Sequence, residues 1–204
     1  MRHNYSPFAN SQLKQSLNHS IYSMPKSISY SRTTITELMI PSYANFGGKI
    51  HGGILLSLMD KVAYACASKH AGTYVVTVSV DGVNFLQPIE VGELLSLHAS
   101  VNYVGRSSMV IGIRVVSENV KTGEKKHTNT SYFTMVAKDD VTGKPTEVPE
   151  LILETKEDIR RCLEAIKRKQ LKEVYKDDFD NEISELHVEK DLHLLANERI
   201  IINP

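Results

Sequence analysis

Cysteine is scarce in this chain of 204 residues, and long apolar runs are absent. The two cysteines, Cys66 and Cys162, lie far apart, which excludes a disulfide framework or a cysteine-rich zinc module and fits a reducing compartment. No apolar run reaches the ~18 residues of a membrane span, and no secretory h-region is found. The 24 basic and 24 acidic residues cancel, so no overall basic field points to nucleic acid or a membrane.

The composition that remains, 41% hydrophobic and 24% charged, is typical of a globular domain with tails. Residues 1–32 carry four basic and no acidic side chains, and residues 33–149 carry ten of each. Residues 150–204 carry ten basic and fourteen acidic side chains. We therefore expect a flexible extension over residues 1–30, a compact domain over 31–149, and a C-terminal helix with an acidic tail over 150–204.

The first thirty residues are rich in Ser and Asn, and no acid precedes Glu37. A disordered extension has this composition. A transit peptide is also Ser-rich and acid-poor, although it is usually richer in Arg. A third interpretation places the natural start at Met24. None of the three bears on the fold of the compact domain.

The compact domain opens with a strand and a helix. Residues 31–40 are rich in β-formers and end at Pro41, as a strand would. A glycine-rich stretch follows, and residues 54–70 then predict a helix. Nearly every position of that helix is apolar or small, so we expect it to be buried most of the way round. Gly72 stands where a helix-ending glycine belongs.

After the helix, alternating apolar and polar residues predict four strands, at 73–85, 92–104, 107–119 and 125–138. This order predicts an α+β hotdog fold, in which an antiparallel meander of about five strands wraps one long helix. The open edges of such a sheet lead us to expect dimerisation. Further on, Thr155 and Asp158 approach a capping box that begins a second helix, with an apolar stripe at helical spacing.

Asp60 is the first candidate for chemistry, because Lys61 is the only other charge between Ile54 and Ala67. Burial of an ionised carboxylate is costly, and an acid in such surroundings suits a general base or a nucleophile. Two structural alternatives stay open, an ion pair with Lys61 and a partly exposed helix face. No G-x-S-x-G elbow, activated cysteine or metal-ligand spacing is found, so we expect no metal and no cofactor.

The stretch NFGGKIHGG, residues 45–53, leads directly into the helix and does not match a P-loop. First-turn N–H groups of a helix lack intrahelical partners and lie at its positive end. We therefore expect His51, Gly52 and Gly53 to position a thioester and stabilise its oxyanion. The alternatives are a tight turn that needs positive φ and a histidine that packs against or caps the helix start.

From Asn45 to Asp60 the sequence NFGGKIHGGILLSLMD resembles the hotdog-fold acyl-CoA thioesterases, in particular bacterial enzymes and the tandem-repeat cytosolic (brain-type) hydrolases. Three further stretches match in order: VTVSVDGVNF at 76–85, GRSSM at 105–109 and VPELILET at 148–155. The resemblance covers about residues 31–170. It implies hydrolysis of acyl-CoA to fatty acid and coenzyme A in the cytoplasm, within fatty acid metabolism, with coenzyme A as substrate and product and with no nucleic-acid partner.

The resemblance also implies the residues of the site. The family's Asn before the glycine loop and Asp in the helix correspond to Asn45 and Asp60, contributed by different subunits of a homodimer, with dimers assembling into hexamers. Asp60 would activate water or attack the carbonyl itself, two routes that the sequence leaves open. Arg106, Ser107 and Ser108 are the expected contacts to the phosphates or pantetheine of coenzyme A.

Two other functions compete with hydrolysis. A hotdog hydratase or dehydratase would use His51 and Asp60 on an enoyl or hydroxyacyl substrate. A non-catalytic acyl-CoA sensor would normally carry an output module such as a helix-turn-helix, and residues 1–30 show no such helical pattern.

Overall fold

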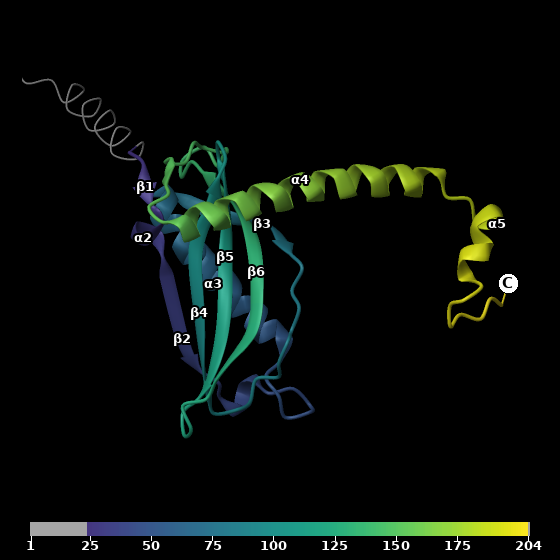
Figure 1. Cartoon of the computed structure of the whole chain (residues 1–204), viewed down its shortest axis with the longest axis horizontal. Coiled ribbons are helices and arrows are strands. Elements are labelled where there is room, and N and C mark those ends of the chain that lie inside the picture. The colour runs from purple at the N-terminus through teal and green to yellow at the C-terminus, as the bar shows by residue number, and fades with distance from the viewer. Residues whose placement is uncertain (1–23, 204) are drawn as a thin grey trace, which may run out of the picture. The chain divides into compact units, whose positions relative to one another are not determined.

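The computed structural model describes residues 24–203 (Figure 1); the proposals for the first 23 residues lie outside them. The chain forms two units, one up to Cys162 and one from Leu163 onward, which are described separately. The elements of the first unit are β1 (Lys26–Ser27), α2 (Ile28–Ser31), β2 (Thr33–Leu38), the 3-10 turn η1 (Pro41–Tyr43), α3 (Gly52–Ala71), β3 (Tyr74–Asp81), β4 (Glu93–Val104), β5 (Ser108–Asn119), β6 (Lys125–Lys138) and β7 (Leu151–Ile152). α4 (Lys156–Glu185) starts in this unit and continues into the second, which also holds α5 (Val188–Asp191) and the 3-10 turn η2 (Leu192–Leu195).

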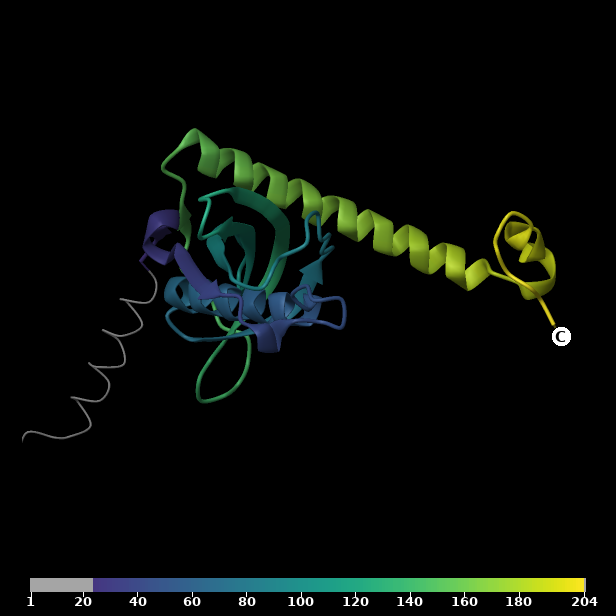
Figure 2. The same ribbon diagram turned by 90° about the horizontal axis from the view of Figure 1, so that it is seen from below.

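Five antiparallel strands curl over α3, as the view in Figure 2 shows. The core lies between the helix and the sheet: Met59 and Val62 of α3 are fully buried, as are Leu97 of β4, Ile111 of β5 and Phe133 of β6. This arrangement confirms the predicted α+β hotdog fold. α3 begins at Gly52, two residues earlier than predicted, and ends at Gly72 in the left-handed conformation, with φ of 74°.

The strand order is β2-β4-β5-β6-β3, so the prediction of a simple meander is wrong for β3. Short turns join β4 to β5 and β5 to β6, which forces these strands to be neighbours. Residues 82–92 instead connect β3, at one edge of the sheet, to β4, the second strand from the other edge, so these eleven residues pass β6 and β5. β3 therefore pairs with β6 alone and is an edge strand.

α3 is buried on one face only, so the expectation of burial most of the way round is wrong. The buried side comprises Leu55, Leu58, Met59, Val62, Ala63, Cys66, Ala67, His70 and Ala71. The opposite side exposes Leu56, Ser57, Asp60, Lys61 and Tyr64. A single sheet covers one side of a helix, and the apolar composition of the second side therefore indicates another covering surface.

The N-terminal boundary lies earlier than residue 31. Lys26 and Ser27 pair in parallel with Leu151 and Ile152, and Ile28 is buried. The Lys26 ammonium donates to the carbonyl oxygens of Lys69 and His70 at the C-terminus of α3, at 3.2 and 2.8 Å. Burial lowers the pKa of Lys26. These contacts tie residues 26–28 to the domain, because cations stabilise the negative end of a helix.

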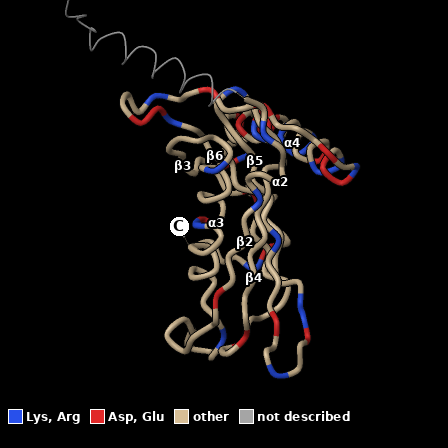
Figure 3. Tube along the Cα trace, turned by 90° about the vertical axis from the view of Figure 1, so that its left-hand side faces the viewer, with Lys and Arg blue, Asp and Glu red and all other residues tan. Residues whose placement is uncertain are grey.

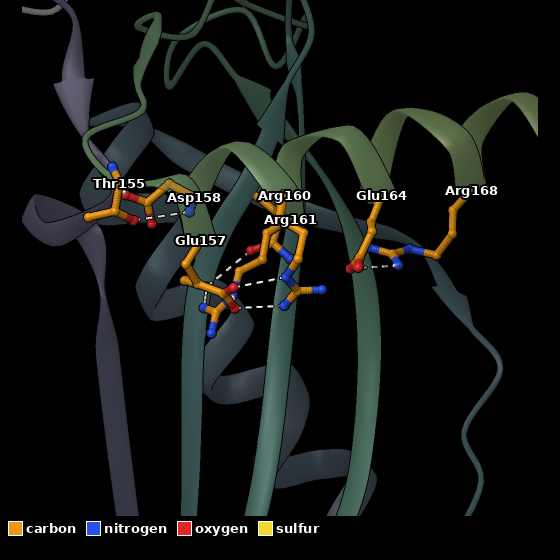
Figure 4. A network of polar contacts seen from close by, with 9 residues as sticks. Thr155, Glu157, Asp158, Arg160, Arg161, Glu164 and Arg168 are labelled. Atoms are coloured by element: carbon orange, nitrogen blue, oxygen red, sulfur yellow. Dashed lines mark hydrogen bonds and ion pairs between the residues drawn. The ribbon is translucent and has the colours of Figure 1, made fainter.

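α4 begins with the predicted capping box. The Asp158 N–H donates to Thr155 Oγ1 at 3.1 Å, and the Thr155 N–H donates to Asp158 Oδ2 at 3.0 Å (Figure 4). In the next positions, hydrogen bonds from Arg160 and Arg161 lower the pKa of Glu157 to about 2. None of the helices described is long and apolar enough to cross a membrane.

Glu93 is a buried carboxylate at the start of β4. It accepts a hydrogen bond from the Glu90 N–H at 3.1 Å, and its Oε1 lies 2.8 Å from the Lys126 ammonium of β6. Desolvation raises the pKa of Glu93, but the hydrogen bonds from Lys126 and the Glu90 N–H outweigh it, and the pKa is lowered. The pair joins two strands that are not neighbours in the sheet.

Candidate active site

Asn45 organises the loop that precedes α3. Its side-chain Oδ1 accepts hydrogen bonds from the N–H groups of Gly47 and Lys49, at 2.9 and 3.2 Å. Gly48 has φ of 75°, so the predicted alternative of a turn that needs positive φ is confirmed at this position. Asn45 is exposed, and no hydrogen bond from its Nδ2 is found among the described residues. The loop therefore holds the oxygen of the amide and leaves its donor available.

His51 caps α3. Its Nδ1 accepts a hydrogen bond from the Gly53 N–H at 2.8 Å, so the capping interpretation is confirmed. A neutral ring that accepts at Nδ1 carries its proton on Nε2. The Gly53 N–H, one of the expected oxyanion donors, is thereby engaged within the loop. Gly52 is the next candidate, because the first N–H groups of a helix have no acceptor inside it.

Phe85 lies over the start of α3. A Cβ added at Gly52 would be 3.1 Å from Phe85 Cζ and 3.4 Å from Cε2, which is tighter than an ordinary contact. Glycine at position 52 thus lets the ring approach the backbone amide. The sequence predicts no role for Phe85 beyond its place in the motif at 76–85. Its position over α3 depends on the path of residues 82–92, which local sequence patterns do not determine.

Asp60 lies on the exposed side of α3, so the expectation of a buried acid is wrong for the protomer, and the alternative of an exposed helix face is confirmed. Its Oδ1 accepts a hydrogen bond from Thr77 Oγ1 of β3 at 2.6 Å. Asp60 makes no ion pair among residues 24–203, so the alternative pairing with Lys61 is also wrong; adjacent helical residues do not face each other. The sequence did not predict a role for Thr77, because the register of β3 in the sheet determines which of its side chains faces α3.

Exposed apolar side chains flank Asp60 on α3 and lie along β3. Leu56 and Tyr64 are one helical turn before and after Asp60, and Tyr74, Val78 and Val80 belong to the strand that carries Thr77; all five are between 38% and 60% exposed. The rings of Tyr64 and Tyr74 lie 6.3 Å apart between centroids. An acid held in the middle of an apolar surface, beside a strand edge, is positioned to be enclosed by another protein surface.

Arg106, Ser107 and Ser108 lie at the turn that joins β4 to β5. The Arg106 and Ser107 carbonyls accept hydrogen bonds from the N–H groups of Val148 and Ala137, which fixes the turn. A pocket of about 480 Å³ is lined by Arg106, with the carboxylates of Glu147 and Glu150 on the same wall. Ser107 and Ser108 do not line that pocket.

The structure does not bring all the expected residues together within one protomer. The Asn45 loop precedes α3 at one end of the sheet, while the Arg106 turn lies at the other end, where α3 finishes (Figure 1). Asp60 lies between them, eight residues or ~12 Å along α3 from Gly52. Among the described residues, no group of three or more His, Cys, Asp or Glu could hold a metal ion.

Comparison with known proteins identifies the family. The family model described as "Thioesterase superfamily" matches residues 47–124. Protein VdlD of Helicobacter pylori is 49% identical over 138 residues, which cover 68% of this chain and 78% of that protein. An uncharacterized acyl-CoA thioester hydrolase of Bacillus subtilis, YkhA, is 36% identical over 138 residues, 68% of this chain and 80% of its own. The chain belongs to the acyl-CoA thioester hydrolases of the thioesterase superfamily.

Solved structures of this hydrolase family share the fold. A hexameric acyl-CoA thioesterase matches with a TM-score of 0.72 and 38% identity, over 75% of this chain and 97% of that one. The acyl-CoA hydrolase of Staphylococcus aureus, solved with butyryl coenzyme A and coenzyme A, matches with a TM-score of 0.70 and 33% identity, over 78% and 96% of the two chains. The resemblance read from the sequence is thus confirmed at the level of family and fold.

Proposed function

We propose that this thioesterase hydrolyses acyl-CoA to a free fatty acid and coenzyme A, at a site shared by two protomers. The observation that supports the proposal is the position of Asp60, held by Thr77 in the middle of an exposed apolar surface. Asn45 of the same chain lies in the exposed loop that precedes α3, and its Nδ2 is available to donate. A two-fold axis beside α3 and β3 would place Asp60 of one protomer near Asn45 of its partner.

The partner surface is a second copy of this chain. β3 is an edge strand, and an edge strand can pair with an identical strand across a two-fold axis. The exposed apolar residues of α3 and β3 would be buried in the same contact, which would also enclose Asp60. Since solved relatives include hexameric thioesterases, we extend the proposal to a trimer of such dimers. Relatives named as cytosolic hydrolases support a cytoplasmic location.

Hydrolysis needs a base, a water molecule and an oxyanion donor. Asp60 accepts a proton from the water while the water oxygen bonds to the thioester carbon. The C–S bond then breaks, and coenzyme A leaves as thiolate. In the alternative route the Asp60 carboxylate attacks the thioester carbon and expels coenzyme A as thiolate, and water then hydrolyses the anhydride to the fatty acid and the free Asp60 carboxylate. The Gly52 N–H stabilises the oxyanion, His51 and Gly53 hold the helix start in place, and the partner's amide side chain orients the water or the thioester.

The coenzyme A end of the substrate requires cations. Arg106 is the proposed phosphate contact, with Ser107 and Ser108 as hydrogen-bond donors beside it. Glu147 and Glu150 share the pocket wall with Arg106 and reduce its positive charge. We therefore expect Arg106 to bind the phosphate at the rim of this pocket, facing solvent.

Hydrolysis is favoured over hydration of an enoyl substrate by the relatives, which are named acyl-CoA thioester hydrolases. His51 Nδ1 is occupied by the Gly53 N–H, so a hydratase role would have to use Nε2. A sensor without turnover would not need an acid held by a strand hydroxyl. Release of thiol from a saturated acyl-CoA separates hydrolysis from both alternatives.

A mixing experiment tests the shared site. Asn45→Ala and Asp60→Asn should each lose about 10²–10⁴-fold in thiol release. When the two variants are co-expressed, half of the dimers are mixed and each mixed dimer has one intact site, so about 25% of wild-type activity should return. Co-expression of Asp60→Asn with the double variant is the matched control and should return nothing. Absence of recovery in the first pair would overturn the shared site.

A further inference from the structure

The second unit carries an apolar stripe on α4 that the proposed function does not use. The stripe consists of Leu171, Tyr175, Phe179 and Ile183, which are 50% to 68% exposed. Successive members are four residues apart, so they lie along one side of the helix. The rings of Tyr175 and Phe179 are stacked, with centroids 6.0 Å apart. A helix with such a face is normally covered by a partner.

Charges along α4 are segregated in sequence. Residues 167–176 contain five basic side chains and one acidic side chain, whereas residues 177–186 contain five acidic and no basic side chains. Figure 3 shows charged residues crowded along α4 and sparse along α3. The segment 167–186 is thus positive in its first half and negative in its second half, with the apolar stripe running through both halves.

We infer that the stripe is a pairing surface on which α4 of one chain packs antiparallel against α4 of a second copy. With the two-fold axis beside Phe179, Tyr175 of each chain lies opposite Ile183 of the other. The same register places Lys176 of each chain opposite Glu182 of the other. An isologous contact repeats each pair twice, so the positive half of each helix meets the negative half of its partner.

A second copy fits this surface better than other partners. A parallel pairing of the same helices would place the positive halves together and the negative halves together, which opposes association. An anionic lipid surface would attract residues 167–176 but repel residues 177–186. Only an antiparallel copy of the segment, among these, complements both halves and covers the stripe. The inference is independent of the catalytic residues.

Cysteine cross-linking of the full chain tests the pairing. Phe179→Cys places a thiol at the two-fold axis, within disulfide reach of its own copy. Asp177→Cys, two residues earlier on the opposite face, is the matched control. Under mild oxidation we expect a disulfide-linked dimer from Phe179→Cys and at most about a tenth of that yield from Asp177→Cys. Equal yields from the two variants, or none from Phe179→Cys, would overturn the pairing.

A second pair of positions reports the direction. In the antiparallel register, two Tyr175 positions are ~12 Å apart along the helices, so Tyr175→Cys should not cross-link to itself. Tyr175→Cys should cross-link to Ile183→Cys when the two variants are co-expressed. Self-cross-linking of Tyr175→Cys would show parallel helices and refute the proposed register.

Charge reversal tests the complementarity. Lys176→Glu and Glu182→Lys, each in the Phe179→Cys background, create two like-charge contacts and should slow cross-linking roughly tenfold. The double reversal restores opposite charges and should restore the rate. Asp177→Lys makes a similar charge change on the opposite face and should have little effect. Circular dichroism confirms that each variant keeps its helix. A double reversal that stays slow while remaining helical would refute the pairing of Lys176 with Glu182.

Discussion

The hydroxyl of Thr77 donates a hydrogen bond to Asp60 Oδ1 across 2.6 Å, which joins the edge strand β3 to the exposed side of α3. This contact aims a carboxylate that the helix by itself would leave free to rotate. β3 has a register shift between Thr77 and Ser79, so the strand is bent next to this contact. The position of the proposed catalytic acid therefore depends on a strand that the protein leaves open at its edge.

Removal of the Thr77 hydroxyl tests this positioning role. Thr77→Val keeps the shape of the side chain but loses the donor, so we expect kcat to fall about 10-fold to 100-fold with a small change in KM. Thr77→Ser keeps the donor and should recover most of the activity. Both variants should melt close to wild type. A Thr77→Val enzyme with unchanged kcat would show that the hydrogen bond does not orient Asp60 for catalysis.

The helix cap made by His51 predicts a loss of stability separable from catalysis. His51→Ala removes the acceptor for the Gly53 N–H and should destabilise the protein by about 1 kcal/mol. His51→Asn offers a replacement cap and should restore stability, as measured by urea unfolding. If His51 only caps, thiol release by His51→Asn should stay within a few-fold of wild type. A loss of a thousandfold in that stable variant would instead assign His51 a proton-transfer role.

The close approach of Phe85 to Gly52 predicts a non-additive pair of substitutions. Gly52→Ala would place a Cβ 3.1 Å from the ring and displace it, so we expect reduced activity. Phe85→Ala makes room for that methyl group. The double variant should therefore be more active than the product of the two single effects predicts. Additive effects on kcat/KM, measured for all three variants, would show that the ring and the helix start act independently.

The buried pair of Glu93 and Lys126 predicts a pH-dependent stability. The pKa of Glu93 is lowered in the folded protein, so its contribution is present above the ordinary carboxyl pKa and is lost as pH falls through the folded value. The pKa of Lys126 is raised, so its contribution is lost only as pH rises above the ordinary lysine range. Between these limits, Glu93→Gln should destabilise the protein by about 2 kcal/mol.

Urea unfolding at several pH values checks this prediction. The difference between Glu93→Gln and wild type should be largest near pH 7 and should shrink as the pH is lowered below 4, because wild-type Glu93 then also becomes neutral. Lys125→Met, which removes an exposed lysine next to Lys126, is a suitable control and should show little pH-dependent difference. A Glu93→Gln penalty that does not change with pH would mean that the carboxylate charge contributes nothing.

Local sequence patterns determined most of the elements and several of their ends, although β3 ends at Asp81 and not at residue 85 as predicted. Alternating apolar residues placed the strands, Gly72 marked the end of α3, and the reciprocal bonds of Thr155 and Asp158 began α4 as predicted. The motif between Asn45 and Asp60 indicated the family that the comparisons confirmed. These features depend on hydrogen bonds between residues close in sequence and on the spacing of apolar side chains along a few turns or strand positions. A single sequence shows both directly.

Only the tertiary structure decided that β3 pairs with β6, that Asp60 faces solvent beside Thr77, and that the Gly53 amide is taken by His51. A stretch of apolar residues indicates that its side chains will be buried, but it does not indicate whether the sheet of the same chain or a second protein covers them. Pairings between distant segments depend on chain crossings and strand register, which local periods do not contain. The sequence of α3 is therefore the same for a helix buried on all sides and for a helix whose second side forms an interface, and the position of the sheet decides between them.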